Sequence, residues 1–388
     1  MGDGTIRHIG SSSDPPLLTS DDIPTLGVEE EFVLVDSHSR AAVNCAPVVI
    51  KGAQGVLGDQ IGAEIFPTMV ETRTHPVTTL DGLYKELYRL RAGVAAAAAE
   101  YGCRAVASGT VIVPSRGPTE VTDHARYLRM ATEYGPLVSG DQGTGVCGCH
   151  IHVGVAGREQ AVQLANHLRP WLPALQALAA NSPFHAGRDS GYASWRTMRW
   201  AQWPGAGPAP LFPDATAYDT LVDSLVTSGL LVDRRMVYWY ARPSEHCPTV
   251  EIRVADVNAD VDTVILLAGL ARALAAVLLT DVRRGIPAPD VPDALLRAAH
   301  WRAARDGLTG RGVDPATGGH HPAAETVDRL LRRAAPALEA AGDLPLVREL
   351  WQRRRVLGGG ADRQREAFRR RGDLRDVVDV LTVTADRS

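Results

Sequence analysis

The stretch Thr25–Asp36, TLGVEEEFVLVD, shows the clearest strand pattern in the chain, and the predicted architecture is built outward from it. Side chains on a strand alternate between its two faces. Glu29 and Glu31 therefore share one face. The other face is mainly apolar and carries Val28, Glu30, Phe32 and Leu34.

Two later segments repeat this design. CHIHVGV, residues 149–155, places His150 and His152 on one face and apolar residues behind them. VEIRVAD, residues 250–256, does the same with Glu251 and Arg253. A solvent-exposed strand face would be the simple explanation of one such strand. Three strands with acids and histidines in the paired positions favour a functional face instead.

Carboxylates packed side by side repel one another unless a cation lies between them, so the three strands predict a metal site. Histidine favours zinc, whereas carboxylates favour Mg²⁺ or Mn²⁺. Glutamates outnumber imidazoles here once Glu64 and Glu71 of AEIFPTMVETR are added, which favours Mg²⁺ or Mn²⁺. Metal ions beside Arg253 would suit a polyphosphate. The chain has no GxxxxGK[ST] motif, so bound ATP would not sit on a P-loop.

Substrate contacts are predicted in an aromatic segment, 181–210, since arginines bind carboxylates and aromatic rings shape small pockets. A structural loop held by its tryptophans explains the segment equally well. Arg73, near Glu71, is a further candidate, with exposed charge as its alternative. The predicted substrate-binding residues are Arg73, Arg188, Tyr192, Arg196 and Arg199.

Four other polar or thiol side chains near these strands are interpreted as structural. Cys147 and Cys149 form a CxC pair without a second pair, so buried core cysteines are favoured over a metal or redox pair. His246 and Cys247 lie close to the Glu251 strand, and a loop role is favoured for them.

Composition bounds the class of protein. The chain has 388 residues and a net charge of -4, which argues against bulk attraction to nucleic acid. Five scattered cysteines favour a reducing cytoplasm over a disulfide framework. The apolar stretch Val264–Leu279 contains Arg272 and predicts a buried helix rather than a membrane span. A homo-oligomer is compatible with these features.

The order of elements predicts an α+β fold with a mainly antiparallel sheet and flanking helices. Residues 1–21 are rich in Gly, Ser, Asp and Pro and predict a flexible lead-in, and residues 22–388 are expected to form one catalytic domain with a helical part from about 260. Strands are predicted at Ala41–Ile50, Ala63–Thr72 and Arg104–Val113, and helices at Leu80–Tyr101 and Gln160–Asn181, the latter broken at Pro170 and Pro173.

Taken together, five segments resemble the type 2 glutamate–cysteine ligase family, also called carboxylate–amine ligases. The likeness runs from about Asp22 to about Val380. The segments are GVEEEFVLVD, CGCHIHVGV, LRPWLPALQALAANSPFHAGRDSGYASWR, RPSEHCPTVEIRVADV and GADRQR.

The resemblance implies a glutamine-synthetase-like fold whose curved antiparallel sheet forms a funnel for ATP and metal. It implies that ATP converts a γ-carboxylate into an acyl phosphate, which a small amine then attacks. Amino acids and amines would be the substrates. Metal ligands would be Glu29, Glu31, Glu64, Glu71, His150 and Glu251; nucleotide contacts His150, His152 and Arg253; catalytic residues Glu251 and Arg253.

One short segment and two single residues depart from the family pattern. Phe66–Met69 replaces residues that are usually polar, Tyr240 stands where an acidic residue is usual, and Cys149 stands where Met is usual. These departures leave the carboxylates intact and bear on the choice of substrates.

Two other function classes fit parts of the pattern. A metal hydrolase could use His150 and His152 with zinc-activated water. A nucleotide or amino-acid sensor could retain the ligase fold without turnover. The intact Glu29, Glu31 and Glu251 argue against a sensor, which need not keep a full phosphate site.

Overall fold

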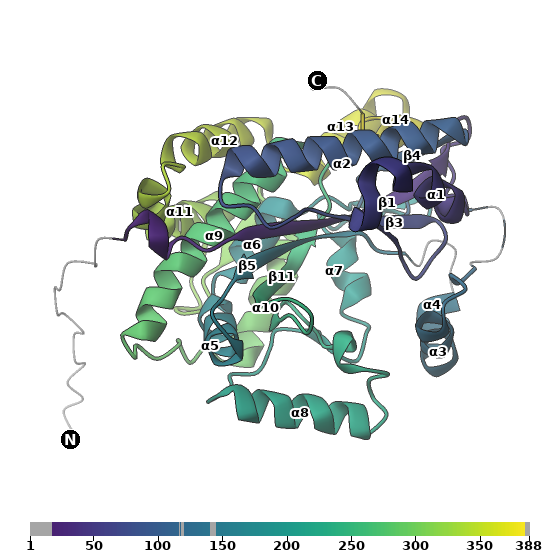
Figure 1. The fold of residues 1–388 in the computed structure, drawn as a ribbon. Helices are drawn as coiled ribbons and strands as arrows, with labels where there is room; N and C mark the ends of the chain where they lie inside the picture. The colour runs from purple at the N-terminus through teal and green to yellow at the C-terminus, as the bar shows by residue number, and fades with distance from the viewer. Residues whose placement is uncertain (1–17, 116, 118–119, 140–144, 385–388) are drawn as a thin grey trace, which may run out of the picture.

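A computed structural model describes residues 18–115, 117, 120–139 and 145–384. Most of the predicted lead-in therefore lies outside the described residues, and its last part forms the short helix η1, Ser20–Asp22. Figure 1 shows the described chain as a central sheet with helices on both sides.

The central sheet has seven strands in the order β10-β11-β5-β1-β3-β2, with β4 also paired to β1. Every pairing within it is antiparallel, as the sequence predicts. β5 and β4 share one edge of β1, and β3 takes the other. The strands are β1 Leu26–Asp36, β2 Ile61–Ala63, β3 Met69–Arg73, β4 Cys103–Val106, β5 Gly148–Gly154, β10 Ala241–Pro243 and β11 Thr249–Asp256.

The apolar back of the sheet packs on helices. Val28, Ile151 and Ile252 lie in one buried cluster with residues of α2, α5, α6 and α9. Phe32 and Leu34 lie in a second cluster with residues of α1 and α2. These helices are α1 Ala46–Leu57, α2 Leu80–Glu100, α5 Arg158–Leu168, α6 Leu172–Ala179 and α9 Val261–Arg283.

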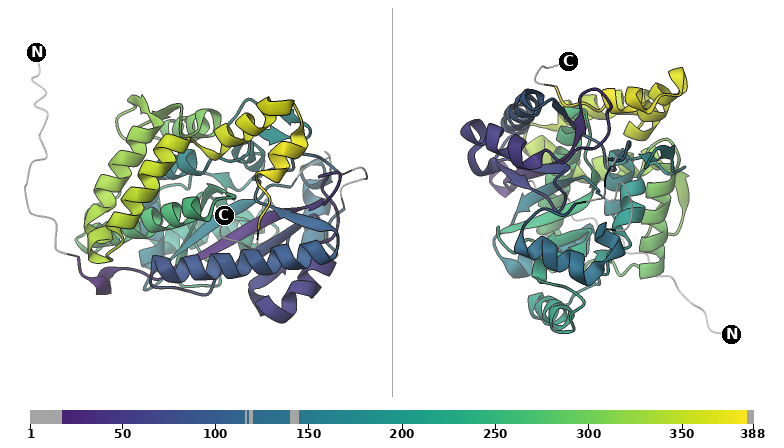
Figure 2. Two further views of the ribbon diagram at one scale, coloured as in Figure 1. Left: turned by 90° about the horizontal axis from the view of Figure 1, so that it is seen from above. Right: turned by 90° about the vertical axis from the view of Figure 1, so that its right-hand side faces the viewer.

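The C-terminal part is mainly helical from Val261, in agreement with the sequence. Its later helices are α10 Asp293–Asp306, α11 Ala323–Ala340, α12 Leu344–Leu357, α13 Gly360–Arg371 and α14 Leu374–Asp379, with a small hairpin of β12 Arg311–Val313 and β13 His320–Pro322. Of these, α12, α13 and α14 lie on the same side of the sheet as α2, and α8 lies on the opposite side (Figures 1 and 2).

Shorter elements complete the described part of the fold. They are η2 Gly58–Gln60, α3 Ala125–Tyr134, α4 Pro136–Ser139, β6 Phe184–His185, β7 Arg188–Asp189, α7 Trp195–Trp200, β8 Ala206–Gly207, α8 Ala215–Thr227, η3 Arg234–Met236 and β9 Tyr238–Trp239. β8 and β9 pair in parallel, and β6 and β7 pair as a tight hairpin.

Helix α9 is long and apolar enough to cross a membrane, but 94% of its most apolar 18-residue window is buried inside the protein. Arg272 in its middle donates to the carbonyl of Thr78 at 2.6 Å and forms an ion pair with Asp343. A buried charge with these partners fits a core helix, as the position of Arg272 predicts.

The strand predicted at Ala41–Ile50 is wrong. A single bridge joins Ala42 to Val35, and α1 then begins at Ala46. Pro47 in the first turn favours a helix start. The buried residues of α1 are spaced three or four apart, as Ala46, Val49, Ala53 and Leu57, which is a helical period.

Two other predicted strands are shorter than expected. The Ala63–Thr72 strand is interrupted around Pro67, which divides it into β2 and β3. The Arg104–Val113 strand ends at Val106, and the residues after it form a loop.

One ion pair lies within the apolar back of the sheet. Glu30 is buried and receives two hydrogen bonds from Arg91 of α2, at 2.9 and 2.5 Å. Arg91 also donates to the carbonyls of Asn258 and Ala259, both at 2.6 Å. Glu30, the buried charged residue on the apolar face of β1, therefore links β1 through Arg91 to α2 and to the segment after β11.

We predict that Glu30→Gln lowers the free energy of unfolding by about 3–5 kcal/mol, because it leaves the buried Arg91 guanidinium without a counter-charge. Chemical denaturation measures the loss. The double variant Glu30→Met with Arg91→Met removes both charges and should lose less than Glu30→Gln alone. The exposed pair Asp81–Lys85 supplies the control, since Asp81→Asn should cost less than about 1 kcal/mol. Equal losses in Glu30→Gln and Asp81→Asn would contradict this account.

Candidate functional site

Strand register brings the polar pairs of the front face together. Glu29 lies opposite His150, and Glu31 lies opposite Glu71. Glu251 lies opposite His152 on one side and Arg242 on the other. The strand alternation that the sequence predicts thus forms one continuous polar surface on β3, β1, β5, β11 and β10.

A pocket of about 420 Å³ opens on this surface. Its second wall comes from α3, α7 and the segment around η3 and β9, and it is rich in aromatic rings. The lining residues other than those already named as predicted ligands include Ile65, Phe66, Met69, Arg73, Arg126, Tyr127, Met130, Val146, Trp200, Trp203, Arg235, Tyr238, Arg242, Ser244, Glu245, His246 and Cys247.

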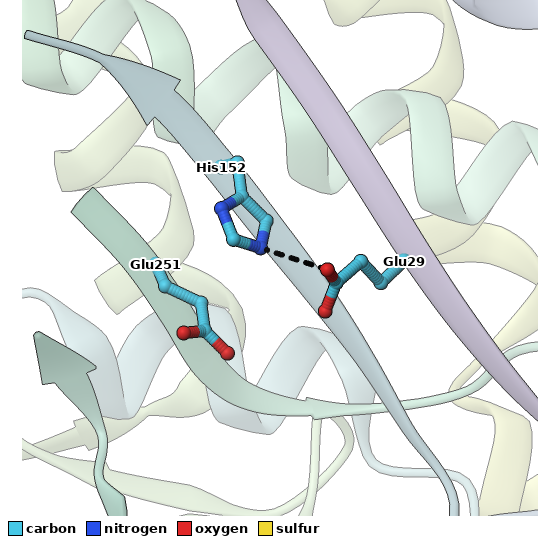
Figure 3. Close-up of side chains that lie close together, drawn as sticks. All are labelled: Glu29, His152 and Glu251. Atoms are coloured by element: carbon cyan, nitrogen blue, oxygen red, sulfur yellow. Dashed lines mark ion pairs between the residues drawn. The ribbon is translucent and has the colours of Figure 1, made fainter. Parts of the chain in front are cut away.

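Three groups of side chains in the pocket have the spacing of metal ligands. Within each group, one ligand atom from every residue lies within 4.8 Å of the others. Two of the groups share Glu29, and two share Glu71. The groups are Glu29–His152–Glu251, Glu29–Glu71–His150 and Glu31–Glu64–Glu71, the first of which is drawn in Figure 3.

The donor atoms fit a divalent cation. His150 Nε2 and His152 Nε2 are buried without a hydrogen-bond partner in the described part of the chain. His150 Nδ1 lies 3.3 Å from Glu29 Oε2, and His152 Nε2 lies 3.5 Å from Glu29 Oε1. Together the three ligand groups join five carboxylates to two imidazoles, and oxygen-rich sets of this kind suit Mg²⁺ or Mn²⁺ better than zinc.

Burial and mutual repulsion favour the protonated form of the third ligand group, Glu31, Glu64 and Glu71, which we call the acidic cluster. Burial raises the pKa of Glu64 to about 8, with Glu31 adding to the shift. Burial and the neighbouring Glu29 raise the pKa of Glu71 well above its usual range. Burial also raises the pKa of Glu31, although Arg196 and the Gly148 N–H, which donates to it at 2.5 Å, act in the opposite direction.

The charge of Glu251, in the first ligand group, is balanced differently, because two arginines contact it. Glu251 forms ion pairs with Arg253 and with Arg242, whose Nε lies 2.9 Å from Glu251 Oε2. The Arg253 guanidinium lies over the rings of Trp200 and Tyr238, at 5.3 and 5.7 Å from their centroids. Burial, with Arg242 nearby, lowers the pKa of Arg253 to about 9, so it remains a cation at neutral pH.

The backbone of β11 explains how Arg253 reaches the pocket. The pairing of β11 with β5 shifts register between Ile252 and Ala255. On its other edge the strand stays paired, since the Arg253 N–H donates to the carbonyl of Tyr240 at 2.8 Å and so continues the pairing with β10. Irregularities of this type redirect a side chain next to a site.

The predicted substrate-binding residues do not gather in one place. Arg73 lines the pocket, and its Nε donates to the carbonyl of Asp59 at 3.0 Å. Arg196 is buried beneath the acidic cluster, where it donates to the carbonyl of Arg253 at 3.2 Å. Arg188, Tyr192 and Arg199 are not among the lining residues. The Tyr192 ring packs on Trp195 and lies under the Arg305 guanidinium.

Several lining residues escaped the sequence analysis. Arg242 gave no signal, because its role depends on lying opposite Glu251. Trp200 and Trp203 enter the sequence analysis only as tryptophans that could hold a structural loop, and Tyr127 and Tyr238 have no pattern that marks them. His246 and Cys247 line the pocket from the turn between β10 and β11, although a structural role had been favoured for them. Cys147 and Cys149 are buried, in agreement with the core interpretation.

The antiparallel sheet with a carboxylate-lined pocket on its front agrees with the glutamine-synthetase-like fold that the resemblance in the sequence implies. The model of glutamate–cysteine ligase family 2 matches residues 25–380, and the chain belongs to this family. It is therefore a carbon–nitrogen ligase, which confirms the resemblance seen in the sequence.

Curated relatives agree with this assignment. One from Salinispora tropica, named "Putative glutamate--cysteine ligase 2", is 46% identical over 368 residues, which cover 95% of this chain and 96% of the relative. A relative from Saccharopolyspora erythraea is 46% identical over 359 residues, covering 92% of this chain and 94% of its own length.

Solved structures share the fold at low identity. A glutamate–cysteine ligase from Francisella tularensis in complex with AMP aligns with a TM-score of 0.66 and 13% identity, over 92% of this chain and 88% of that one. A bifunctional glutathione synthetase from Pasteurella multocida aligns with a TM-score of 0.68 and 14% identity, over 93% of this chain and 52% of that one.

We predict that Mn²⁺ binding strengthens as pH rises from about 6 to about 8 and then levels off. A metal ion must displace the protons held at Glu64 and its neighbours, so a higher pH favours binding until the pKa of about 8 is passed. Titration calorimetry in two buffers of different ionisation enthalpy measures the affinity and the released protons. Glu64→Gln should bind more weakly and release fewer protons, whereas Glu349→Gln on the exposed surface of α12 should match the parent chain. An affinity independent of pH over this range would contradict the prediction.

Proposed function

We propose that the protein uses ATP to activate the γ-carboxylate of glutamate or a related amino acid and joins it to a small amine, with cysteine as one candidate amine. The observation that carries the proposal is the chain of three ligand groups linked through Glu29 and Glu71 in one pocket, next to Arg253. Several cation sites beside a fixed guanidinium would supply the charge neutralisation that phosphoryl transfer requires.

The residues proposed to hold Mg²⁺ or Mn²⁺ are Glu29, Glu31, Glu64, Glu71, His150 and Glu251. When bound, the metal ions would offset the negative charge of the polyphosphate and of the departing ADP. His152, a member of the first group, contacts Glu29, and its Nδ1 shares a hydrogen bond with Thr249 Oγ1 at 2.9 Å, which fixes the orientation of its ring.

Arg253 is proposed to contact the transferring phosphoryl group. Its stacking on Trp200 and Tyr238 restricts the guanidinium to the pocket. Glu251 holds both Arg253 and Arg242, so it positions the cations as well as serving as a ligand. Arg242 in turn donates to the carbonyl of Arg235 at 2.6 Å, which ties the strand pair to the opposite wall.

The proposed reaction has two steps. A γ-carboxylate oxygen forms a bond to the γ-phosphorus of ATP, and the bond from that phosphorus to the ADP oxygen breaks, giving an acyl phosphate and ADP. The amine nitrogen then attacks the acyl carbon, loses a proton and releases inorganic phosphate. The pocket residues bind, orient and neutralise charge, which is what phosphoryl transfer requires of a protein.

We predict that ADP release by the parent chain depends on glutamate or a related acid together with an amine. Glu251→Gln should lower kcat by more than about a hundredfold, because it removes a ligand and the partner of two arginines. Glu349→Gln is the matched control and should retain the parent rate. A coupled ADP assay measures the rate, and mass spectrometry identifies the amide. Equal rates in Glu251→Gln and Glu349→Gln would exclude the proposed role of the pocket.

We also predict that glutamate labelled with ¹⁸O in its γ-carboxylate transfers one labelled oxygen to inorganic phosphate. The transfer follows because that oxygen bridges carbon and phosphorus in an acyl phosphate and leaves with phosphate. Mass spectrometry of the phosphate measures the label. Amide formation with unlabelled phosphate would rule out the acyl-phosphate route while leaving ligase activity intact.

A further inference from the structure

One end of the pocket is apolar. Ile65, Phe66 and Met69 come from the β2–β3 connection and the start of β3, Met130 comes from α3, and Val146 precedes β5. We call these five residues the apolar corner. Phe66, Met69 and Met130 are each at most 4% exposed, so the corner is a packed surface and not a loose rim.

The corner lies beside the acidic cluster. Met69 and Glu71 share one face of β3, since they are two residues apart on the strand. Two residues along a strand span about 7 Å. Glu64 immediately precedes Ile65 and belongs to the same ligand group as Glu71. A substrate that reacts beside Glu64 and Glu71 therefore has one part within reach of the corner.

The chemistry of the corner excludes a charged group. None of its five residues carries a charge, and a buried ammonium or carboxylate without a partner is strongly disfavoured. The amino-acid head of glutamate carries both an ammonium and a carboxylate group, so it does not suit the corner. The other end of the pocket, by contrast, offers Arg242, Ser244 and Glu245, which can pair with charged and polar groups.

We propose that the apolar corner binds the side chain of the amine substrate, and that this side chain is uncharged and apolar, of the thioether, branched aliphatic or aromatic class. The inference rests on the proposed ligase function and names its acceptor class. Two methionines in the corner suit side chains of varied shape, because the thioether is flexible and polarisable and packs well on rings.

Gly145 lies against the apolar corner, where a side chain would collide with the corner residues. A Cβ placed on Gly145 would lie 2.7 Å from Met69 Sδ and 3.5 Å from Phe66 Cδ2. The absence of a side chain at this position therefore lets Met69 and Phe66 keep their places beside the pocket. Met69, Phe66 and Gly145 are the residues that we expect to determine amine specificity.

The test compares amines at saturating ATP and glutamate, with hydroxylamine as the minimal nucleophile. Ethylamine, butylamine and benzylamine form the apolar series, and ethylenediamine is the charged counterpart. ADP release gives kcat/KM for each amine. We expect kcat/KM to rise roughly tenfold or more from ethylamine to butylamine or benzylamine, and to fall for ethylenediamine.

Variants then locate the effect. Met69→Gln keeps the side-chain length but introduces an amide, so the ratio of kcat/KM for benzylamine to that for hydroxylamine should fall about tenfold. Met130→Gln, on a different element, should lower the same ratio. Met198→Gln is the matched control, since Met198 lies on α7 outside the pocket lining, and its ratio should equal that of the parent chain.

The outcomes separate this inference from the proposed function. Hydroxamate formation with no preference along the apolar series overturns the inference and leaves the ligase function standing. A rise in KM for ATP in Met69→Gln with hydroxylamine as nucleophile would assign the corner to the purine and also overturn it. Failure of every amine, hydroxylamine included, to stimulate ADP release would overturn the proposed function itself.

Discussion

Mutual repulsion among five carboxylates is the constraint on which the pocket depends. Glu29, Glu31, Glu64, Glu71 and Glu251 converge from strands β1, β3 and β11 and from the β2–β3 connection, and water screens their charges less here than at the surface. The protein answers the repulsion in two ways. Arginines neutralise the Glu251 end, and raised pKa values leave the Glu64–Glu71 end partly protonated. The two ends of one pocket therefore differ in charge before any substrate binds.

This difference gives the pocket a direction. The arginine-rich end suits negatively charged groups, and the acidic end suits cations. The apolar corner adds a third environment beside the acidic end. Three such environments side by side would suit the proposed reaction, in which a polyphosphate, a charged amino acid and a neutral nucleophile have to be held together.

Local sequence pattern was sufficient for the strand faces. Alternation in TLGVEEEFVLVD and in the two later strands placed Glu29, His150 and Glu251 on the front correctly, because alternation is a property of the strand itself. The helical break near Pro170 followed from proline geometry in the same way. The strand predicted at Ala41–Ile50 is wrong because apolar content does not distinguish a strand from a helix, whereas Pro47 marks a helix start.

Contacts between distant segments could not be predicted. Arg242 has no local mark, and its importance arises only from register with Glu251. Arg188 and Tyr192 suit a substrate by residue type, but Arg188 lies on the β6–β7 hairpin and Tyr192 packs on Trp195, and neither lines the pocket. The family resemblance predicted the fold and the reaction class. It could not predict the apolar corner, because Met69 and Met130 are distant in the sequence and meet only in the folded chain.

The Glu30–Arg91 pair has a consequence for the opposite face of the sheet. If β1 slipped by two residues, its polar and apolar faces would be preserved, but every ligand on it would move by about 7 Å. Hydrophobic pattern alone opposes such a slip only weakly. The buried ion pair is satisfied in one alignment of β1, α2 and the segment after β11. An interaction on the back of the sheet thus fixes the strand register that aligns the proposed metal ligands on the front.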